Sequence, residues 1–279
     1  MFRWQIAEYG SLFRLFPMIS AALARRTRVT EERIPFGPHP QQYVLLCQPP
    51  ERKANALLFF AHGGGWRMGN PWSFRFIGRY FAEQGFVTVL GGYRLAPKFQ
   101  FPAQMQDIYA GLRVSLQAAK ERGLPANKVL LGGQSAGAQL VSLLAYDRDE
   151  LERRGLDQSF FAGLLLVSGP LDFSVCTHRT VTQLVNDFVG DPANKDKADP
   201  IRYVRGDEAL PALCIHGDCD PLVDALNSIS FVNKINQSGK QQAQVRIVKG
   251  GHHSDLVTLF LQGSPSAKFL VDWLMEKAK

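Results

Sequence analysis

The sequence predicts an α/β fold in which a mostly parallel central sheet is covered by helices on both faces. Continuous apolar runs such as residues 56–61 and 162–169 have the composition of strands that are buried on both sides. Segments with helical periodicity alternate with these runs along the chain. The chain has 279 residues, of which 46% are apolar, so we expect one large domain over residues 1–279.

Composition excludes several classes of protein. The 32 basic and 25 acidic residues give a net charge of +7, but the basic residues are scattered, and no aromatic-interleaved basic motif predicts a nucleic-acid partner. No apolar run reaches the roughly 18 residues that span a membrane. Arg3, Glu8 and Arg14 interrupt any signal-peptide core. Four cysteines without C-x-x-C spacing predict reduced thiols in a cytoplasmic protein: Cys47, Cys176, Cys214 and Cys219.

The first 23 residues predict an amphipathic helix. Within residues 2–23, apolar side chains recur every three or four positions, and the basic residues Arg25, Arg26 and Arg28 follow. Three interpretations remain open for this helix. It packs on the domain, it caps the mouth of an active site, or it lies on a membrane surface.

A glycine-rich loop follows the first buried strand. Residues 33–36 and 43–47 predict an antiparallel pair at the edge of the sheet, and residues 56–61 predict a central strand. The strand runs into His62-Gly63-Gly64-Gly65-Trp66. Three consecutive glycines expose backbone N–H groups that can bind a developing oxyanion, although a flexible turn has the same composition. His62 precedes the predicted nucleophile in the chain, so we expect a structural role for it.

The predicted nucleophile is Ser135. Residues 73–84 and 105–122 predict helices on either side of a strand at residues 86–90, and a further strand begins at residue 128. Gly133-Gln134-Ser135-Ala136-Gly137 then joins this strand to a helix. Such a turn forces the serine into a strained, exposed conformation, and the two glycines leave room for the crossing strand and helix. Taken alone, the motif also fits an ordinary serine in a strand-to-helix turn.

Together these motifs resemble a known superfamily. The resemblance is carried by residues 62–66, residues 93–97 (Tyr-Arg-Leu-Ala-Pro) with residues 101–103 and Asp107, and residues 133–137. They are similar to those of the α/β-hydrolases, and within them to the hormone-sensitive-lipase-like esterases and the neighbouring carboxylesterase, kynurenine formamidase and isoprenylcysteine methylesterase group. The resemblance extends from about residue 56 to the C-terminus. It implies an α/β-hydrolase fold with a helical lid.

The second half of the chain predicts the remaining strands and the lid. Residues 162–169, 211–215 and 243–248 predict strands, residues 224–237 a helix, and the residues after Asp255 a helix to the C-terminus. Residues 170–210 contain no clear strand, and they are too many for a simple crossover. We therefore predict a lid insertion there, with a helix at residues 181–189.

Two aspartates and two histidines compete for the remaining catalytic roles. The resemblance selects Asp220, because the family pattern is His-Gly, two residues, Asp, with Val three positions further on; Asp218 is the alternative. Asp220 also fits the N-cap position of a helix, because aspartate is a preferred residue there. In the final loop, the Gly-x-x-His-Ser-Asp pattern of the methylesterase-like group selects His253, whereas a Gly-His pattern selects His252.

These residues predict acyl transfer to water. Ser135 would attack a carbonyl, His253 would accept its proton, and Asp220 would hold the imidazole tautomer. The N–H groups of the oxyanion hole would come from Gly64, Gly65 and Ala136. The predicted reaction needs neither metal nor cofactor, and the expected partner is a small-molecule ester. No oligomeric state is predicted.

Aromatic residues near the motifs predict an uncharged substrate with an apolar part. They are Trp66, Trp72, Phe74 and Phe76 after the glycine loop, and Phe173 and Tyr203 in the predicted lid. We predict a carboxylesterase that prefers short to medium acyl esters to long triglycerides. An arylformamidase that cleaves an N-formyl bond with the same triad, and a non-catalytic ligand-binding α/β-hydrolase, are the alternatives.

Overall fold

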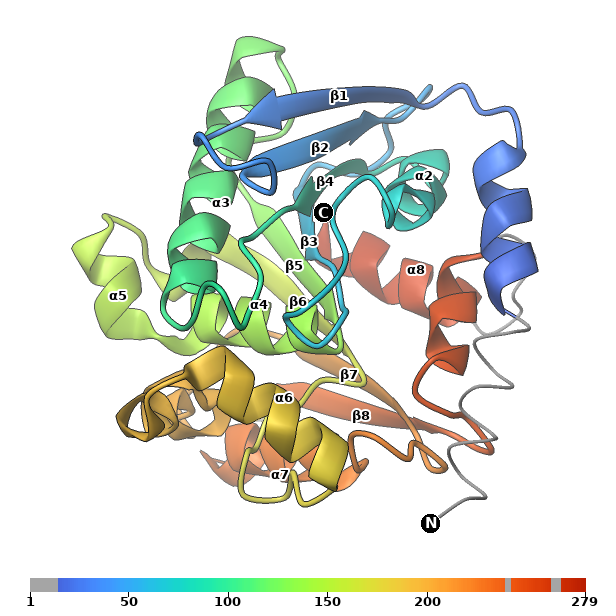
Figure 1. The fold of residues 1–279 in the computed structure, drawn as a ribbon. Coiled ribbons are helices and arrows are strands. Elements are labelled where there is room, and N and C mark those ends of the chain that lie inside the picture. The colour runs from blue at the N-terminus through green and yellow to red at the C-terminus, as the bar shows by residue number, and fades with distance from the viewer. Residues whose placement is uncertain (1–14, 239–241, 262–266) are drawn as a thin grey trace.

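The computed structural model describes residues 15–238, 242–261 and 267–279, and its core is an eight-stranded sheet (Figure 1). The strand order is β1-β2-β4-β3-β5-β6-β7-β8. β1 and β2 pair antiparallel, as do β2 and β4, and every other pair is parallel. The strands are β1 Thr30–Pro35, β2 Tyr43–Gln48, β3 Leu57–Ala61, β4 Val87–Gly91, β5 Val129–Gln134, β6 Phe161–Val167, β7 Ala212–Gly217 and β8 Ala243–Val248. The predicted fold class and edge pair are confirmed.

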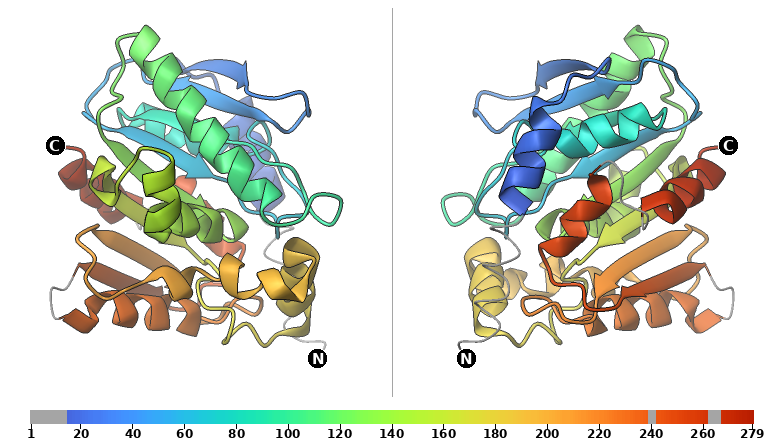
Figure 2. Two further views of the ribbon diagram at one scale, coloured as in Figure 1. Left: turned by 90° about the vertical axis from the view of Figure 1, so that its left-hand side faces the viewer. Right: turned by 90° about the vertical axis from the view of Figure 1, so that its right-hand side faces the viewer.

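Helices cover both faces of the sheet (Figure 2). α3, α4 and α7 pack on one face, while α2, α8 and the helix at residues 15–24 lie on the other. The labelled helices are α2 Arg75–Glu83, α3 Ala103–Glu121, α4 Ala136–Tyr146, α5 Arg148–Arg153, α6 Arg179–Val189, α7 Leu226–Ile235 and α8 Ala267–Lys277. The short helix α5 has no counterpart among the elements predicted from the sequence.

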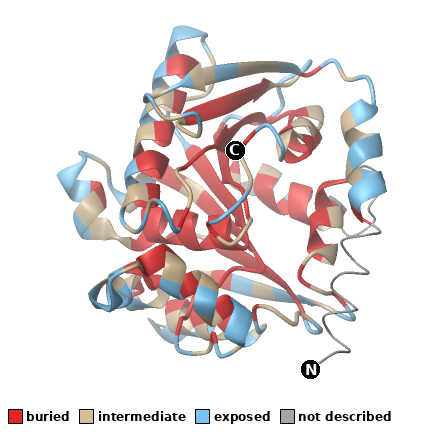
Figure 3. Ribbon diagram, viewed as in Figure 1, coloured by how far each residue is buried: buried red, intermediate tan, exposed pale blue. Residues whose placement is uncertain are grey.

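The alternation of side chains along β3 explains the two cores. Leu57, Phe59 and Ala61 join the core beneath α3 and α4, whereas Leu58 and Phe60 join the core beneath α2 and α8. All five are fully buried, as a strand covered on both faces requires. Figure 3 shows the same pattern for the whole molecule, with buried residues along the central strands and exposed residues on the outer helices.

The prediction of one continuous helix from Asp255 to the C-terminus is wrong. A 3₁₀-helix, η6, occupies Asp255–Phe260, and α8 begins only at Ala267. Between them Leu261 has extended backbone, with φ −102° and ψ 141°, so the helical hydrogen bonds end there. The sequence continues with Gly263 and Pro265, and both residues disfavour a helix interior.

Residues 170–210 contain α6 and three 3₁₀-helices, and no strand is assigned to them. The 3₁₀-helices are η2 Pro192–Asn194, η3 Asp196–Ala198 and η4 Pro200–Tyr203. The helix predicted at residues 181–189 is therefore confirmed, and it starts two residues earlier than expected. Its inward face contributes Val181, Val185 and Phe188 to the core under α4.

The predicted N-terminal helix is described only in part. Residues 2–14 lie outside the described residues, and residues 15–24 are helical. This helix lies beside α2, where the Arg79 guanidinium donates to the Leu23 carbonyl at 2.8 Å. Within the described ranges, no helix is both long and apolar enough to cross a membrane.

Candidate active site

Ser135 lies in a strained turn between β5 and α4. Its backbone has φ 52° and ψ −122°, a conformation that non-glycine residues rarely adopt. The flanking glycines have no space for a side chain. A Cβ on Gly133 would lie 2.4 Å from the Gly137 carbonyl oxygen, and one on Gly137 would lie 2.1 Å from the Ala61 carbonyl oxygen. The strain and the close approach predicted for this motif are confirmed.

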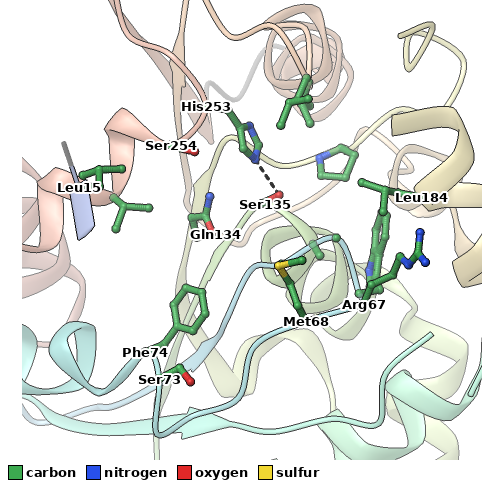
Figure 4. Close-up of a pocket in the computed structure, with 18 of the residues that line it drawn as sticks. Leu15, Arg67, Met68, Ser73, Phe74, Gln134, Ser135, Leu184, His253 and Ser254 are labelled. Carbon is green, nitrogen blue, oxygen red and sulfur yellow. Dashed lines mark hydrogen bonds between the residues drawn. The ribbon is translucent and has the colours of Figure 1, made fainter. Parts of the chain in front are cut away.

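A chain of hydrogen bonds links Ser135 to two loops that are distant in the sequence. His253 Nε2 is 2.9 Å from Ser135 Oγ (Figure 4), and His253 Nδ1 is 2.7 Å from Asp220 Oδ2. Because an ionised carboxylate can only accept, Nδ1 carries the proton and Nε2 accepts from the serine hydroxyl. This is the tautomer that a general base for Ser135 requires.

Asp220 is buried but kept ionised. Its Oδ1 accepts hydrogen bonds from the N–H groups of Leu222 and Val223, at 3.0 and 2.9 Å. Burial on its own would raise the pKa of this carboxyl, but the opposing effects of His253 and His216 hold the pKa well below its ordinary value. An ionised acid beside His253 can stabilise an imidazolium that forms when Ser135 loses its proton.

His216 is a second histidine against Asp220, and sequence reasoning missed it. Its Nε2 lies 3.3 Å from Asp220 Oδ2 and 2.8 Å from the Val223 carbonyl, while Nδ1 lies 2.7 Å from Ser228 Oγ. Both neighbours of Nε2 are acceptors, so Nε2 carries the proton and Ser228 donates to Nδ1. The signal was present in the sequence, because His216 opens the His-Gly pattern that was used only to find Asp220.

The structure separates the competing residues. Asp218 accepts a hydrogen bond from the Gly250 N–H at 2.6 Å, which steadies the loop before the histidines. His252 Nδ1 lies 3.2 Å from Asp255 Oδ2, and its side chain is 27% exposed. His253 therefore contacts Ser135, and Asp220 contacts His253. Asp218 and His252 instead form hydrogen bonds in the loops beside them.

The glycine-rich loop after β3 presents free N–H groups beside Ser135. Gly64 and Gly65 have φ values of +117° and +58°, and a Cβ on Gly64 would lie 2.2 Å from the Met68 carbonyl oxygen. No backbone acceptor in the described ranges is bonded to the N–H groups of Gly64, Gly65 or Ala136. All three residues line the same cavity as Ser135. Unpaired donors around a nucleophile are suited to bind an oxyanion.

His62 supports this loop, as predicted. Its ring is stacked on Tyr93, with 4.3 Å between ring centroids, and lies 5.3 Å from the ring of Phe74. Nδ1 donates to the Gly63 carbonyl at 2.7 Å, and Tyr93 Oη donates to the His62 carbonyl at 2.9 Å. Burial lowers the pKa of His62 to about 4, so the ring is neutral near pH 7.

The Tyr-Arg-Leu-Ala-Pro segment is held by a buried carboxylate. Asp107, which is 1% exposed, accepts from the Arg94 backbone N–H at 2.8 Å and from Arg94 Nε at 2.7 Å. Gln42 Nε2 donates to the same carboxylate at 2.8 Å. This ion pair connects α3 to the segment that carries Tyr93, and Tyr93 in turn holds the loop of His62.

A cavity of about 710 Å³ opens above Ser135. Its walls come from the glycine-rich loop, α6, the loops after β7 and β8, and the helix at residues 15–24. Figure 4 shows Leu15, Gln134 and Phe74 on one side of Ser135, and Leu184 and Arg67 on the other. Ser135 therefore stands between two halves of one predominantly apolar cavity, an arrangement that can hold the two arms of an ester.

Only part of the predicted aromatic lining is present. Trp66, Phe74 and Phe76 line the cavity, although Trp66 is 1% exposed and is stacked on Phe188. Three other aromatic side chains do not line it. Trp72 is 52% exposed on the surface, Phe173 packs edge-on against Trp66 in the core, and Tyr203 donates to the Lys197 carbonyl. Proximity in the sequence to a motif did not predict the direction of these side chains.

Comparisons with known proteins agree with this architecture. Ethyl acetate hydrolase from Pseudomonas putida is 26% identical over 235 residues, which are 75% of this chain and 70% of the relative. Bovine arylacetamide deacetylase is 36% identical over 104 residues, but the match covers 34% of this chain and 26% of that protein. Among solved structures, esterase B from Lactobacillus rhamnosis has a TM-score of 0.78 at 25% identity, covering 98% of this chain and 94% of that chain.

The fold extends to more distant esterases. EstE1, a carboxylesterase cloned from a metagenomic library, has a TM-score of 0.76 at 20% identity, covering 99% of this chain and 96% of that chain. The family model BD-FAE matches residues 45–235, which include the glycine-rich loop, Ser135 and Asp220. Because this match covers more than half of the sequence, the chain belongs to the BD-FAE family, within the α/β-hydrolase esterases.

Proposed function

We propose that Ser135, His253 and Asp220 carry out the carboxylesterase reaction of this α/β-hydrolase. The observation that carries the proposal is the continuous hydrogen-bonded chain from Ser135 Oγ through the His253 ring to Asp220. His253 accepts the Ser135 proton as Ser135 attacks the ester carbonyl. It then returns the proton to the leaving alkoxide, and an acyl-enzyme forms that water hydrolyses in a second, similar step.

The oxyanion hole is assigned to the N–H groups of Gly64, Gly65 and Ala136. These donors line the cavity beside Ser135 without a backbone acceptor in the described part of the chain. In water-excluded sites, the loss of one such donor typically costs about 3–4 kcal/mol of barrier. The glycine conformations of this loop are thus expected to contribute substantially to the rate, although less than the triad itself.

The substrate is proposed to be an uncharged ester of short to medium acyl length. The cavity walls are mostly apolar, and Arg67, the one arginine or lysine among the described lining residues, pairs with Asp187 of α6 at 3.1 Å. Leu184 of α6 lies against Gly65, so we assign the lid function to residues 170–210. Ethyl acetate hydrolase, a relative that matches 75% of this chain, bears the name of a short-chain esterase.

The N-terminal helix is proposed to cap the cavity. Leu15, Phe16 and Ile19 line the same cavity as Ser135, which supports the cap over a helix that only packs on the domain or that lies on a membrane. We further propose a reducing, cytoplasmic location, because all four cysteines are free thiols.

Amide hydrolysis is the second candidate. A triad of this kind also cleaves activated amides, and arylacetamide deacetylase, which matches a third of this chain, is named for such a bond. We expect p-nitrophenyl butyrate to be a better substrate than N-formylkynurenine. A kcat/KM for the formamide that exceeds that of the best ester tenfold would make the protein an arylformamidase instead.

Labelling of the nucleophile tests the proposed function. An organophosphonate is expected to modify Ser135 alone, and Ser135→Ala is expected to fold normally and to lose ester hydrolysis, because alanine lacks the attacking oxygen. Peptide mass spectrometry of the labelled protein identifies the modified residue. Adduct formation on another serine, or full activity of the alanine variant, would contradict the assignment.

A further inference from the structure

The side chain before the nucleophile has no role in the chemistry described above. Gln134 ends β5, is 5% exposed, and lines the cavity next to Ser135. No hydrogen bond joins its side-chain amide to any part of the described chain. Because the amide lines the cavity, it can bond water in the free protein, and a substrate that displaces this water must replace those bonds.

The Gln134 amide has a defined orientation. Its Oε1 lies only 2.0 Å from the position that a Cβ on Gly63 would occupy, so the oxygen is packed against the Gly63 backbone. Because the amide group is planar, Nε2 is directed away from Gly63. Figure 4 shows the nitrogen on the side of the amide that faces Ser254 and His253, inside the cavity. The two Nε2 hydrogens are therefore offered to whatever enters this half of the cavity.

Beyond Ser254 and His253, the wall next to the amide is mainly apolar. Leu15 and Phe74 form the neighbouring wall in Figure 4, and both line the cavity. A purely alkyl arm in this half would cover the Nε2 hydrogens without bonding them. An arm that carries an oxygen acceptor would satisfy them, so the geometry discriminates between these two kinds of ester.

We propose that Gln134 is a specificity residue that donates a hydrogen bond from Nε2 to a second oxygen of the substrate, outside the scissile ester group. The preferred substrates are then esters with an ether, hydroxyl or carbonyl oxygen in the arm that occupies the Leu15 and Phe74 half of the cavity. This inference rests on the proposed function, because the arm is placed by the attack of Ser135 on its ester carbonyl.

Matched pairs of esters test the inference with the full-length protein. On the acyl side, p-nitrophenyl methoxyacetate replaces one methylene of p-nitrophenyl butyrate by oxygen. On the alcohol side, 2-methoxyethyl acetate makes the same replacement in n-butyl acetate. The quantity measured is the ratio of kcat/KM within each pair. Comparing this ratio between variants cancels the different intrinsic reactivities of the esters.

Gln134→Met removes the donor at similar volume. For one of the pairs, we expect the kcat/KM of the oxygen-containing ester to fall roughly threefold to tenfold relative to that of its alkyl partner. This is the range expected for the loss of a hydrogen bond that had replaced one to water. Gln134→Glu replaces the donor by an acceptor and should lower the same ratio at least as far. The control Phe74→Leu changes the volume of the same wall and should leave both ratios unchanged.

The possible outcomes separate the two proposals. If both Gln134 variants hydrolyse the esters with wild-type ratios in both pairs, the specificity role is wrong and the proposed esterase function stands. If Phe74→Leu shifts the ratios as far as Gln134→Met does, shape and not the donor sets the preference, and the role is also wrong. If the wild-type protein hydrolyses none of the four esters in a Ser135-dependent way, both proposals are wrong.

Discussion

At the scale of single residues, the position of the proton on each histidine decides its role. His253 presents an accepting Nε2 to Ser135 because Asp220 binds its Nδ1–H. His252, its neighbour in the chain, is turned to Asp255 instead. The two side chains are thus a natural pair of variant and control, since they share one loop and differ in their partners.

We expect His253→Ala to lower kcat by on the order of 10⁶-fold, because His253 is the base that is hydrogen-bonded to the Ser135 hydroxyl. His252→Ala should lose far less. The double variant Ser135→Ala/His253→Ala should be hardly slower than either single variant, since the triad acts as a unit. Steady-state hydrolysis of p-nitrophenyl butyrate measures all four proteins. If His252→Ala proves the more severe change, the assignment of the base is wrong.

A buried carboxyl within residues 170–210 is expected to make the stability of the fold depend on pH. Asp199 accepts a hydrogen bond from the Phe173 N–H at 3.1 Å. Burial, followed by the charge of Asp172, raises the pKa of Asp199 to about 6. Because the folded value exceeds the unfolded one, ionised Asp199 destabilises the fold above pH 6, and this cost disappears as the pH falls through 6 toward 4.

Asp199→Asn keeps an acceptor for Phe173 and removes the charge. We expect the substitution to raise the free energy of unfolding by about 2 kcal/mol more at pH 7 than at pH 4. Urea unfolding at both pH values measures the difference. The exposed residue Asp196, whose side chain is 72% accessible, supplies the control Asp196→Asn, for which we expect a smaller change. Equal pH dependence in the two variants would contradict the prediction.

Residue roles were predictable from the sequence where a motif constrains the backbone. The strained turn of Ser135 and the glycine-rich loop belong to this class, since their glycines are required by close backbone contacts. The direction of a side chain is set by packing across the fold, which a motif does not encode. For that reason the exposure of Trp72 and the contact of His216 with Asp220 emerged only from the structure.

At the scale of elements, the loop after β3 depends on backbone conformations that only glycine adopts without strain. Gly64→Ala would place a Cβ against the Met68 carbonyl at a φ of +117°. We expect the loop to shift and kcat to fall by about 10²-fold or more, as for the loss of an oxyanion donor. Gly155→Ala is the control, because Gly155 also has positive φ but nothing lies within 4 Å of an added Cβ. Comparable kcat losses in both variants would show that the conformation of this loop has no specific role in catalysis.

The helix at residues 15–24 is incompletely packed, which predicts how its removal acts. A second cavity of about 540 Å³ lies between this helix, α2 and η6, and Met18 and Phe76 are among its lining residues. Where this open cavity separates the helix from α2 and η6, the two sides make fewer van der Waals contacts. We therefore expect removal of residues 1–26 to change the acyl-chain preference more than the melting temperature.

Two point variants sharpen this test. Phe16 lines the cavity above Ser135, whereas Met18 lines only the second cavity. Phe16→Ala should alter the ratio of kcat/KM between butyrate and decanoate esters, and Met18→Ala should not. A large loss of melting temperature with unchanged preference would show that the helix serves packing. Binding of the intact protein to anionic vesicles would favour the membrane-surface interpretation.

At the scale of the whole molecule, the parallel strands bring the motifs together. Ser135 and His253 are 118 positions apart, and both follow a strand at the same edge of the sheet. The carboxyl ends of parallel strands meet at one edge, so the order of motifs after β3, β5, β7 and β8 predicted that they gather there, whereas the choices of Asp220 over Asp218 and of His253 over His252 depended on the family resemblance. The division of the C-terminal segment into η6 and α8 was not predictable from apolar spacing, because residues in both elements have helical periodicity.

The size of the assembled cavity leads to a prediction of chain length. Its volume of about 710 Å³ is shared by both arms of the ester, and the walls at Leu15 and Leu184 bound the two halves around Ser135. An acyl chain that outgrows its half must leave through the mouth and expose apolar surface to water, so each further methylene stops contributing about 0.8 kcal/mol of transfer energy. Across p-nitrophenyl esters from acetate to palmitate, kcat/KM should peak between acetate and octanoate and then fall. A maximum at palmitate would mean that the cap and lid move apart to admit long chains.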